Sequence, residues 1–215
     1  MIVSKGRRYV FIHIPKTGGT ALALALESRA MRDDIMLGDT PKAIKRRRRL
    51  RDATSRGRLW KHSTLADIEG LVDPDELDQL FAFTLVRNPW DRAVSYYHWL
   101  RAQRFDHSAV KLARQLTFPD FVAHPRIMDS FRAYSAGRYM RRSDGREQCD
   151  AYLRLEQFEE DAAPLVAHLG FGLSLPRANH SDRARDYRLY YTDTSAAAIA
   201  DCCAEDIARF GYGFG

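Results

Sequence analysis

Two short segments combine residue types that bind anions. The first, Pro15–Thr20 (PKTGGT), follows the apolar run 9–14. Its glycines let backbone N–H groups approach an anion closely, and a helix N-terminus after them adds partial positive charge. Lys16 adds a full charge, and the hydroxyls of Thr17 and Thr20 can donate hydrogen bonds. We interpret this segment as a phosphate-binding loop.

The loop differs from the P-loop of nucleoside triphosphatases. In that motif, G-x-x-x-x-G-K-[ST], the lysine follows the second glycine, whereas Lys16 precedes both glycines here. The later apolar run 81–86 leads into Arg87 and not into the aspartate that would hold Mg²⁺. These two differences argue against a P-loop kinase or NTPase. This enzyme class stays the alternative, and Mg²⁺-dependent ATP turnover would favour it.

The second anion-binding segment is Arg87–Ser95 (RNPWDRAVS). Arg87 follows an apolar run, and Asn88 is a favoured cap for a helix that we predict over 89–104. Ser95 lies about 9 Å along this helix from its first residue, at 1.5 Å per residue. One anion can therefore contact both Arg87 and Ser95.

Apolar runs of strand length alternate with helical patterns, which predicts an α/β fold with a parallel sheet. The predicted strands are 9–14, 81–86 and 151–155. The predicted helices are 20–30, 89–104, 108–116, 118–124, 158–169 and 194–209. Exposed loops are expected at 32–58, with one helical turn at 43–50, and at 125–145.

Composition points to one ordinary globular domain over residues 1–215. The chain has 215 residues, of which 45% are hydrophobic, and its longest apolar run is far shorter than the roughly 18 residues that cross a bilayer. We expect no transmembrane segment and no secretory signal. The three cysteines form no C-x-x-C pair, which argues against a disulfide framework or a zinc site and favours the cytoplasm.

Basic charge is concentrated in the segment Lys42–Arg58. It holds nine basic residues and one acid, so that the remaining chain, with 25 basic and 27 acidic residues, carries −2 of the total +6. This segment is either a solvated loop or a collar that attracts an anionic acceptor or donor. Nucleic-acid binding through Arg46–Arg51 is the alternative from a different functional class, and we do not expect it, because the charge is one local feature.

Together the two anion-binding segments resemble those of the sulfotransferases that use 3′-phosphoadenylyl sulfate, and most of all the bacterial and Golgi-type carbohydrate branch. The match is close over 11–20 and 83–99 and looser over 61–68. The resemblance implies a P-loop-like three-layer α/β fold with a central parallel β-sheet flanked by helices. It also implies in-line sulfuryl transfer to a hydroxyl of a carbohydrate or glycoconjugate, with no obligatory metal.

The same resemblance implies a role for each matching residue. Lys16 would neutralise the leaving phosphate, and Arg87 with Ser95 would bind the 3′-phosphate. The residues that would hold the 5′-phosphate are Lys16, Thr17, Gly18, Gly19 and Thr20.

His62, in the segment Trp60–Ser63, resembles the general base of related enzymes. An imidazole accepts a proton near neutral pH, and Lys61 beside it would lower its pKa. An ordinary surface histidine is the other interpretation, and Asp67 is the runner-up base. The acceptor, anionic or neutral, is expected to contact loops that carry Tyr134 and Tyr139. Peripheral membrane contact and the oligomeric state stay open.

Overall fold

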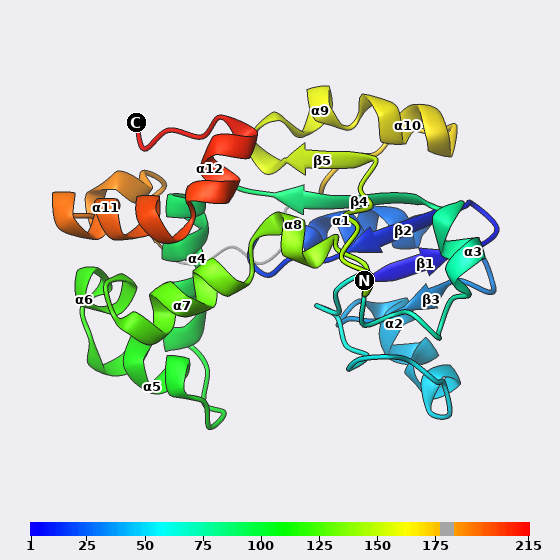
Figure 1. Cartoon of the computed structure of the whole chain (residues 1–215), viewed down its shortest axis with the longest axis horizontal. Helices are drawn as coiled ribbons and strands as arrows, with labels where there is room; N and C mark the ends of the chain where they lie inside the picture. Colours follow the sequence, from blue (N-terminus) through cyan, green and yellow to red (C-terminus); the bar gives the residue numbers. More distant parts are fainter. Residues whose placement is uncertain (177–182) are drawn as a thin grey trace. The chain divides into compact units, whose positions relative to one another are not determined.

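The computed structural model describes residues 1–176 and 183–215, and its core is a five-stranded mixed sheet (Figure 1). The strand order is β3-β1-β2-β4-β5. The strands are β1 (Ile2–Ser4), β2 (Tyr9–Ile12), β3 (Ile35–Met36), β4 (Phe81–Val86) and β5 (Ala151–Arg154). The three strands β2, β4 and β5 are parallel, whereas β1 is antiparallel to both of its neighbours. The α/β fold with central parallel strands is confirmed.

The register of β2 and β4 sets where the chain leaves the sheet. Ile12 at the end of β2 pairs with Thr84 in β4, and the Thr84 hydroxyl donates a 2.7 Å hydrogen bond to the Ile12 carbonyl. Because the two strands are parallel, their carboxyl ends lie at the same edge of the sheet. The segments that follow β2 and β4 in the sequence therefore both start from this edge.

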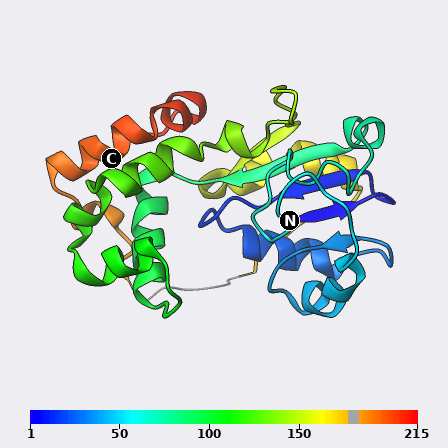
Figure 2. The same cartoon turned by 60° about the horizontal axis from the view of Figure 1, so that its bottom comes forward.

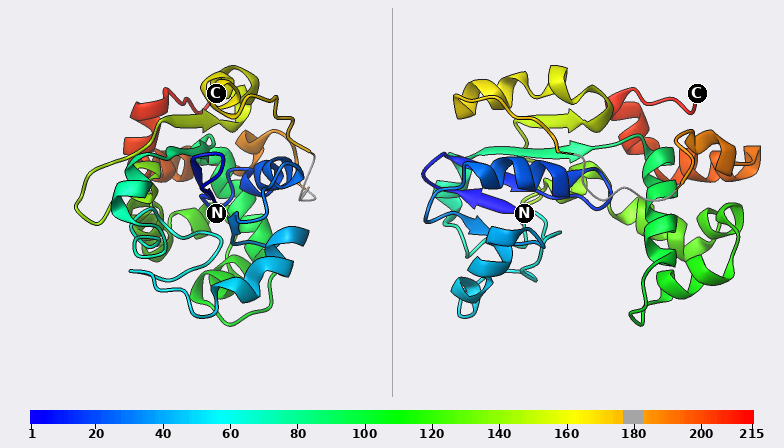
Figure 3. Two further views of the ribbon diagram at one scale, coloured as in Figure 1. Left: turned by 90° about the vertical axis from the view of Figure 1, so that its right-hand side faces the viewer. Right: turned by 180° about the vertical axis from the view of Figure 1, so that it is seen from behind.

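Helix α1 (Gly19–Ser28) covers one face of the sheet (Figure 3). Its side chains Leu22 and Leu26 belong to the same buried cluster as Phe11 of β2 and Phe83 of β4. Helices α9 (Phe158–Asp161) and α10 (Ala163–Leu169) add further apolar side chains to this cluster. Because apolar side chains cover strands β2 and β4, the sequences of these strands are mainly apolar and do not alternate between apolar and polar residues.

The described chain divides into two compact units. Residues 1–86 and 136–176 form the sheet unit, and residues 87–135 and 183–215 form the helical unit. Short elements of the sheet unit are α2 (Pro41–Arg46), η1 (Arg47–Leu50), α3 (Pro74–Asp78), α8 (Ala136–Tyr139) and η2 (Leu155–Gln157). The single domain over 1–215 stays a prediction.

The helical unit, whose helices are drawn in Figure 2, has its own apolar core. It contains α4 (Pro89–Arg101), α5 (Ser108–Gln115), α6 (Phe118–Val122), α7 (Pro125–Ala133), η3 (Tyr187–Tyr190), α11 (Asp193–Cys202) and α12 (Ala204–Phe210). Helix α4 begins as the sequence predicts, because the Asn88 side chain accepts hydrogen bonds from the N–H groups of Trp90 and Asp91. Its side chains Trp90, Val94 and Tyr97 are buried in this core.

Several predicted elements were wrong. The predicted loop 125–145 contains α7 and α8, because Pro125 occupies the first turn of α7 and the spacing of Ile127 and Phe131 buries one helical face. The sequence also gave no hint of β1 and β3, which have three and two residues. Each of the last two predicted helices is interrupted, at Ala162 and Cys203.

Among residues 1–176 and 183–215, no helix is long and apolar enough to cross a membrane. In the same part of the chain, no group of three or more His, Cys, Asp and Glu side chains is arranged to hold a metal ion.

Candidate active site

The loop between β2 and α1 has a backbone that suits anion binding. Lys16 and Gly18 both adopt left-handed conformations, with φ of 66° and 88°. A left-handed conformation is unfavourable for lysine, so the surrounding structure must hold it in place. Loops that mix left- and right-handed residues turn successive N–H groups towards one concave side, which is a common way to bind phosphate.

The two glycines of the loop are required for different reasons, Gly18 mainly by its left-handed backbone and Gly19 by close packing. A Cβ atom on Gly18 would lie 2.8 Å from Leu155 Cδ1, and one on Gly19 would collide with the imidazole of His13. Any larger residue would therefore push the loop away from the sheet. This packing holds the N-terminus of α1 directly against the end of β2.

The N-terminus of α1 carries no competing negative charge. Within α1, all of whose residues are described, the first turn has no acidic side chain, and no side chain caps the helix at Gly18. In the first turn, the N–H of Ala21 donates to the carbonyl of Gly18 at 2.9 Å, whereas the N–H groups before it have no acceptor inside the helix. These groups and the partial positive charge of the helix end favour an anion at this position.

The two threonines of the loop differ in role. The Thr17 side chain is 1% exposed, and its hydroxyl donates a 2.9 Å hydrogen bond to the carbonyl of Ile14. This hydrogen bond closes the loop, so only the backbone N–H of Thr17 would donate to a phosphate. Thr20 is half-buried in the first turn of α1 and lines a pocket in the sheet unit.

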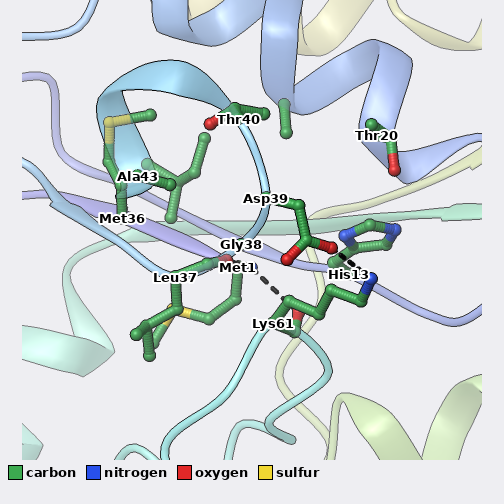
Figure 4. Close-up of a pocket in the computed structure, with 12 residues that line it drawn as sticks. Met1, His13, Thr20, Met36, Leu37, Gly38, Asp39, Thr40, Ala43 and Lys61 are labelled. Carbon is green, nitrogen blue, oxygen red and sulfur yellow. Dashed lines mark hydrogen bonds and ion pairs between the residues drawn. The ribbon is translucent and has the colours of Figure 1, made fainter. Parts of the chain in front are cut away.

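This pocket lies beside the start of α1 (Figure 4). Lys61 and Asp39 form an ion pair of 2.5 Å there, and the His13 ring lies next to them. The hydrogen bond from Lys61 holds the pKa of Asp39 below its ordinary value. The pocket thus has both apolar walls and a fixed pair of charges.

His62 is joined to the strand that leads into the loop. Its Nδ1 lies 2.7 Å from the carbonyl oxygen of His13. Because a carbonyl oxygen only accepts hydrogen bonds, Nδ1 carries the proton, and Nε2 of the neutral ring keeps its lone pair. The Ser63 hydroxyl, which donates to the carbonyl of Arg58 at 2.8 Å, stabilises the turn that carries His62.

The electrostatic environment keeps His62 neutral. Burial lowers its pKa to about 4, the hydrogen bond to His13 opposes this shift, and the charge of Lys61 lowers the pKa further. Burial also holds the pKa of His13 well below its ordinary value. The imidazole of His62 is therefore a neutral proton acceptor at physiological pH.

Arg87 and Ser95 both belong to the helical unit. The Arg87 guanidinium binds the carboxylate of Asp91 through Nε at 2.9 Å and Nη2 at 2.5 Å. A second arginine, Arg183, binds the other oxygen of this carboxylate at 2.7 Å. Ser95 is buried in α4, two turns after Arg87. Arg87 and Asp91 are four residues apart, a spacing at which side chains often pair on a helix, so this contact could be predicted from the sequence. The contact between Arg183 and Asp91 could not, because the two residues are far apart in the sequence.

Other residues named from the sequence are less well placed for a site. Asp67 binds the N–H and hydroxyl of Thr64 and so stabilises a local turn. Tyr139 is buried and is not available to a sugar, while Tyr134 is exposed. In the basic segment, Arg46 donates to the carbonyl of Asp34 and Arg49 to that of Arg32, so these two arginines stabilise the local fold.

The structure thus places a glycine-rich loop at the start of α1 and a buried histidine next to it, at the end of a parallel strand of an α/β sheet. The model of the Sulfotransferase family matches residues 1–212, and the chain belongs to this family. Sulfotransferases are transferases that move a sulfuryl group. No curated protein sequence matches the chain.

Proposed function

We propose that the protein transfers a sulfuryl group from 3′-phosphoadenylyl sulfate to a hydroxyl of a carbohydrate or glycoconjugate. The observation that carries this proposal is the contact between His62 and His13. It ties a neutral base to the residue that packs against Gly19 of the anion-binding loop. A base and a phosphate cradle joined in this way match the two requirements of sulfuryl transfer, which are proton removal and stabilisation of the leaving group.

The residues around the loop fit the donor. Gly18 and Gly19 let the loop pack closely against Leu155 and His13, and the first turn of α1 offers N–H groups and has no acidic side chain of its own. Arg87 and Ser95 follow β4 in the sequence and are our candidates for the 3′-phosphate. The donor supplies the activated sulfuryl group, and 3′-phosphoadenosine 5′-phosphate is the expected product.

The chain's own residues perform two steps. His62 accepts the proton of the acceptor hydroxyl on Nε2, so that this oxygen can form the new bond to sulfur while the bond from sulfur to the phosphate oxygen breaks. Lys16 and the loop N–H groups of Thr17 to Thr20 neutralise the negative charge that remains on this phosphate. Preorganised donors at a developing oxyanion typically contribute about 10²- to 10³-fold to the rate.

The acceptor is expected to be an anionic or neutral saccharide. Several exposed arginines of the basic segment, among them Arg47, Arg48 and Arg51, favour an anionic one, because the guanidinium fork suits carboxylate and sulfate groups. We expect a cytoplasmic protein, since all three cysteines are described and none is in a disulfide.

Transfer from radiolabelled 3′-phosphoadenylyl sulfate to a panel of saccharides, glycolipids and phenols tests the proposal. We expect label in at least one saccharide or glycolipid, and none with the His62→Ala variant. Label confined to phenols would overturn the acceptor class, and no transfer to any hydroxyl would overturn the proposed reaction.

A further inference from the structure

The first part of the basic segment is folded onto the sheet unit. Helices α2 and η1 follow each other without a break, and Ala43 of α2 belongs to the same buried cluster as the sheet residues. Arg46 donates to the carbonyl of Asp34 at 3.1 Å, and Arg49 donates to that of Arg32 at 2.7 Å. These contacts hold α2 beside the edge strand β3, as Figure 1 shows. The charges of this part of the chain are therefore fixed on one surface.

The side chains that project from α2 and η1 are mostly cationic. Residues 41–51 contain seven basic residues and no acidic one. Four of the basic residues are exposed and form no ion pair with any residue that the structure describes, namely Lys45, Arg47, Arg48 and Arg51. We call these four residues, together with Ile44, the α2–η1 surface. Because no carboxylate of the described chain pairs with these cations, the surface attracts anions from solution.

Ile44 adds an apolar side chain to this cationic surface. Its neighbour Ala43 is the buried residue of α2, so Ile44 points away from the core and is 54% exposed. An isoleucine that leaves water for the acyl boundary of a membrane gains free energy, while cations beside it contact the anionic headgroups. A dissolved polyanion would neutralise the cations and leave Ile44 in water. The combination of groups therefore fits a membrane better than a dissolved polyanion.

We propose that the α2–η1 surface binds the face of a membrane that contains anionic lipids. Clusters of four or more basic residues beside an apolar anchor supply the two attractions, electrostatic and hydrophobic, that peripheral membrane binding needs. The partner is the layer of anionic headgroups, and Ile44 enters the boundary between the headgroups and the acyl chains.

The α2–η1 surface lies close to the candidate active site. The hydrogen bond from Lys61 lowers the pKa of Asp39, and the charge of Arg47 lowers it further. Asp39 lines the pocket beside the start of α1 (Figure 4). Membrane binding would therefore bring this pocket to a hydroxyl that a glycolipid presents. This consequence rests on the proposed function, whereas membrane binding itself does not.

Sedimentation of the full chain with lipid vesicles tests the proposal. We expect binding to vesicles of phosphatidylcholine and phosphatidylglycerol in equal parts, and none to phosphatidylcholine alone. Binding should weaken as the salt concentration rises, because salt screens exposed charges. A triple variant with Arg47→Gln, Arg48→Gln and Arg51→Gln should bind the mixed vesicles about 100-fold more weakly.

The matched control removes the same charge from the helical unit. It combines Arg104→Gln, Arg114→Gln and Arg126→Gln, all at exposed positions, and should keep the wild-type affinity for the mixed vesicles. Equal losses in the two triple variants would show attraction by net charge alone and would overturn the proposal. Wild-type protein that does not bind the mixed vesicles, or that binds both kinds of vesicle equally, would also overturn it.

The Ile44→Ser variant separates a membrane from a dissolved polyanion. It should weaken binding to the mixed vesicles about fivefold or more and leave binding to heparin unchanged. Unchanged vesicle binding would show a general anion-binding surface and would overturn the proposal in favour of a dissolved polyanion. None of these outcomes bears on sulfuryl transfer, because the measurements use neither the donor nucleotide nor an acceptor hydroxyl.

Discussion

The pH dependence of sulfuryl transfer should reveal the buried state of His62. Burial lowers the pKa of this histidine to about 4. If Nε2 accepts the acceptor proton, kcat/KM will fall on the acid side only when the ring becomes protonated. At pH 5.5 a base of pKa 4 is about 97% neutral, whereas an ordinary histidine of pKa near 6.5 is about 9% neutral. We therefore expect about ten times more activity at pH 5.5 than an exposed histidine would allow.

The assay is the initial rate of transfer at limiting acceptor from pH 4 to 8, with the donor saturating. The expected profile is flat from pH 8 to about 5 and falls below that. An acid limb centred between pH 6 and 7 would refute the account of a buried base. The His62→Ala variant serves as the control: it should lose about 10²- to 10⁴-fold in rate, and its remaining activity should show no acid limb from this group.

Unfolding at low pH must be measured in the same range, because the same pKa shift affects stability. The folded pKa of His62 lies below its unfolded value, so the unfolded chain binds more protons between pH 6.5 and 4. The contribution of neutral His62 to the free energy of unfolding is complete above pH 6.5 and is lost as the pH falls towards 4. The loss amounts to about 3 kcal/mol for a shift of this size. Urea unfolding from pH 4 to 7 should show this fall, and His62→Ala should reduce it.

Three substitutions test the remaining parts of the site. Lys16→Ala should lower kcat about 10²-fold or more with an unchanged circular dichroism spectrum, and near wild-type kcat would exclude Lys16 from leaving-group stabilisation. Arg87→Ala should weaken binding of 3′-phosphoadenosine 5′-phosphate about tenfold or more by calorimetry, whereas unchanged affinity would place the 3′-phosphate elsewhere. Gly19→Ala should lower the free energy of unfolding by about 1–3 kcal/mol because its Cβ meets the His13 ring. Gly172→Ala, at a site with no neighbour within 4 Å, is its control, and equal effects of both changes would contradict the packing argument.

The parts of the fold that the sequence predicts well are those with strong local signals. The apolar run 81–86 is β4 to the residue, and the Asn88–Pro89 pair marks the first turn of α4. The two shortest strands have too few residues to form a pattern, and their pairing depends on contacts with β2. Residues 125–145 are rich in arginine and other polar residues, so the helical spacing of the apolar residues in α7 could not be recognised from the sequence.

The residues of the candidate site divide in the same way: some lie in short sequence motifs, whereas others are joined by contacts between positions far apart in the sequence. The sequence points to the loop, to His62 and to Arg87 because each lies in a short motif. It does not reveal that the proton of His62 Nδ1 is held by the carbonyl of His13, since these residues are 49 positions apart. The contact between Asp91 and Arg183 spans 92 positions and is likewise invisible to local pattern. Such contacts depend on the packing of the folded chain.

The most direct test of the central claim is a crystal structure with 3′-phosphoadenosine 5′-phosphate bound. We expect the 5′-phosphate on the N–H groups at the start of α1, with Lys16 on its oxygens, and the 3′-phosphate on Arg87 and Ser95. A nucleotide bound elsewhere, or one whose 3′-phosphate lies away from Arg87, would contradict the assignment of these two segments to one donor site.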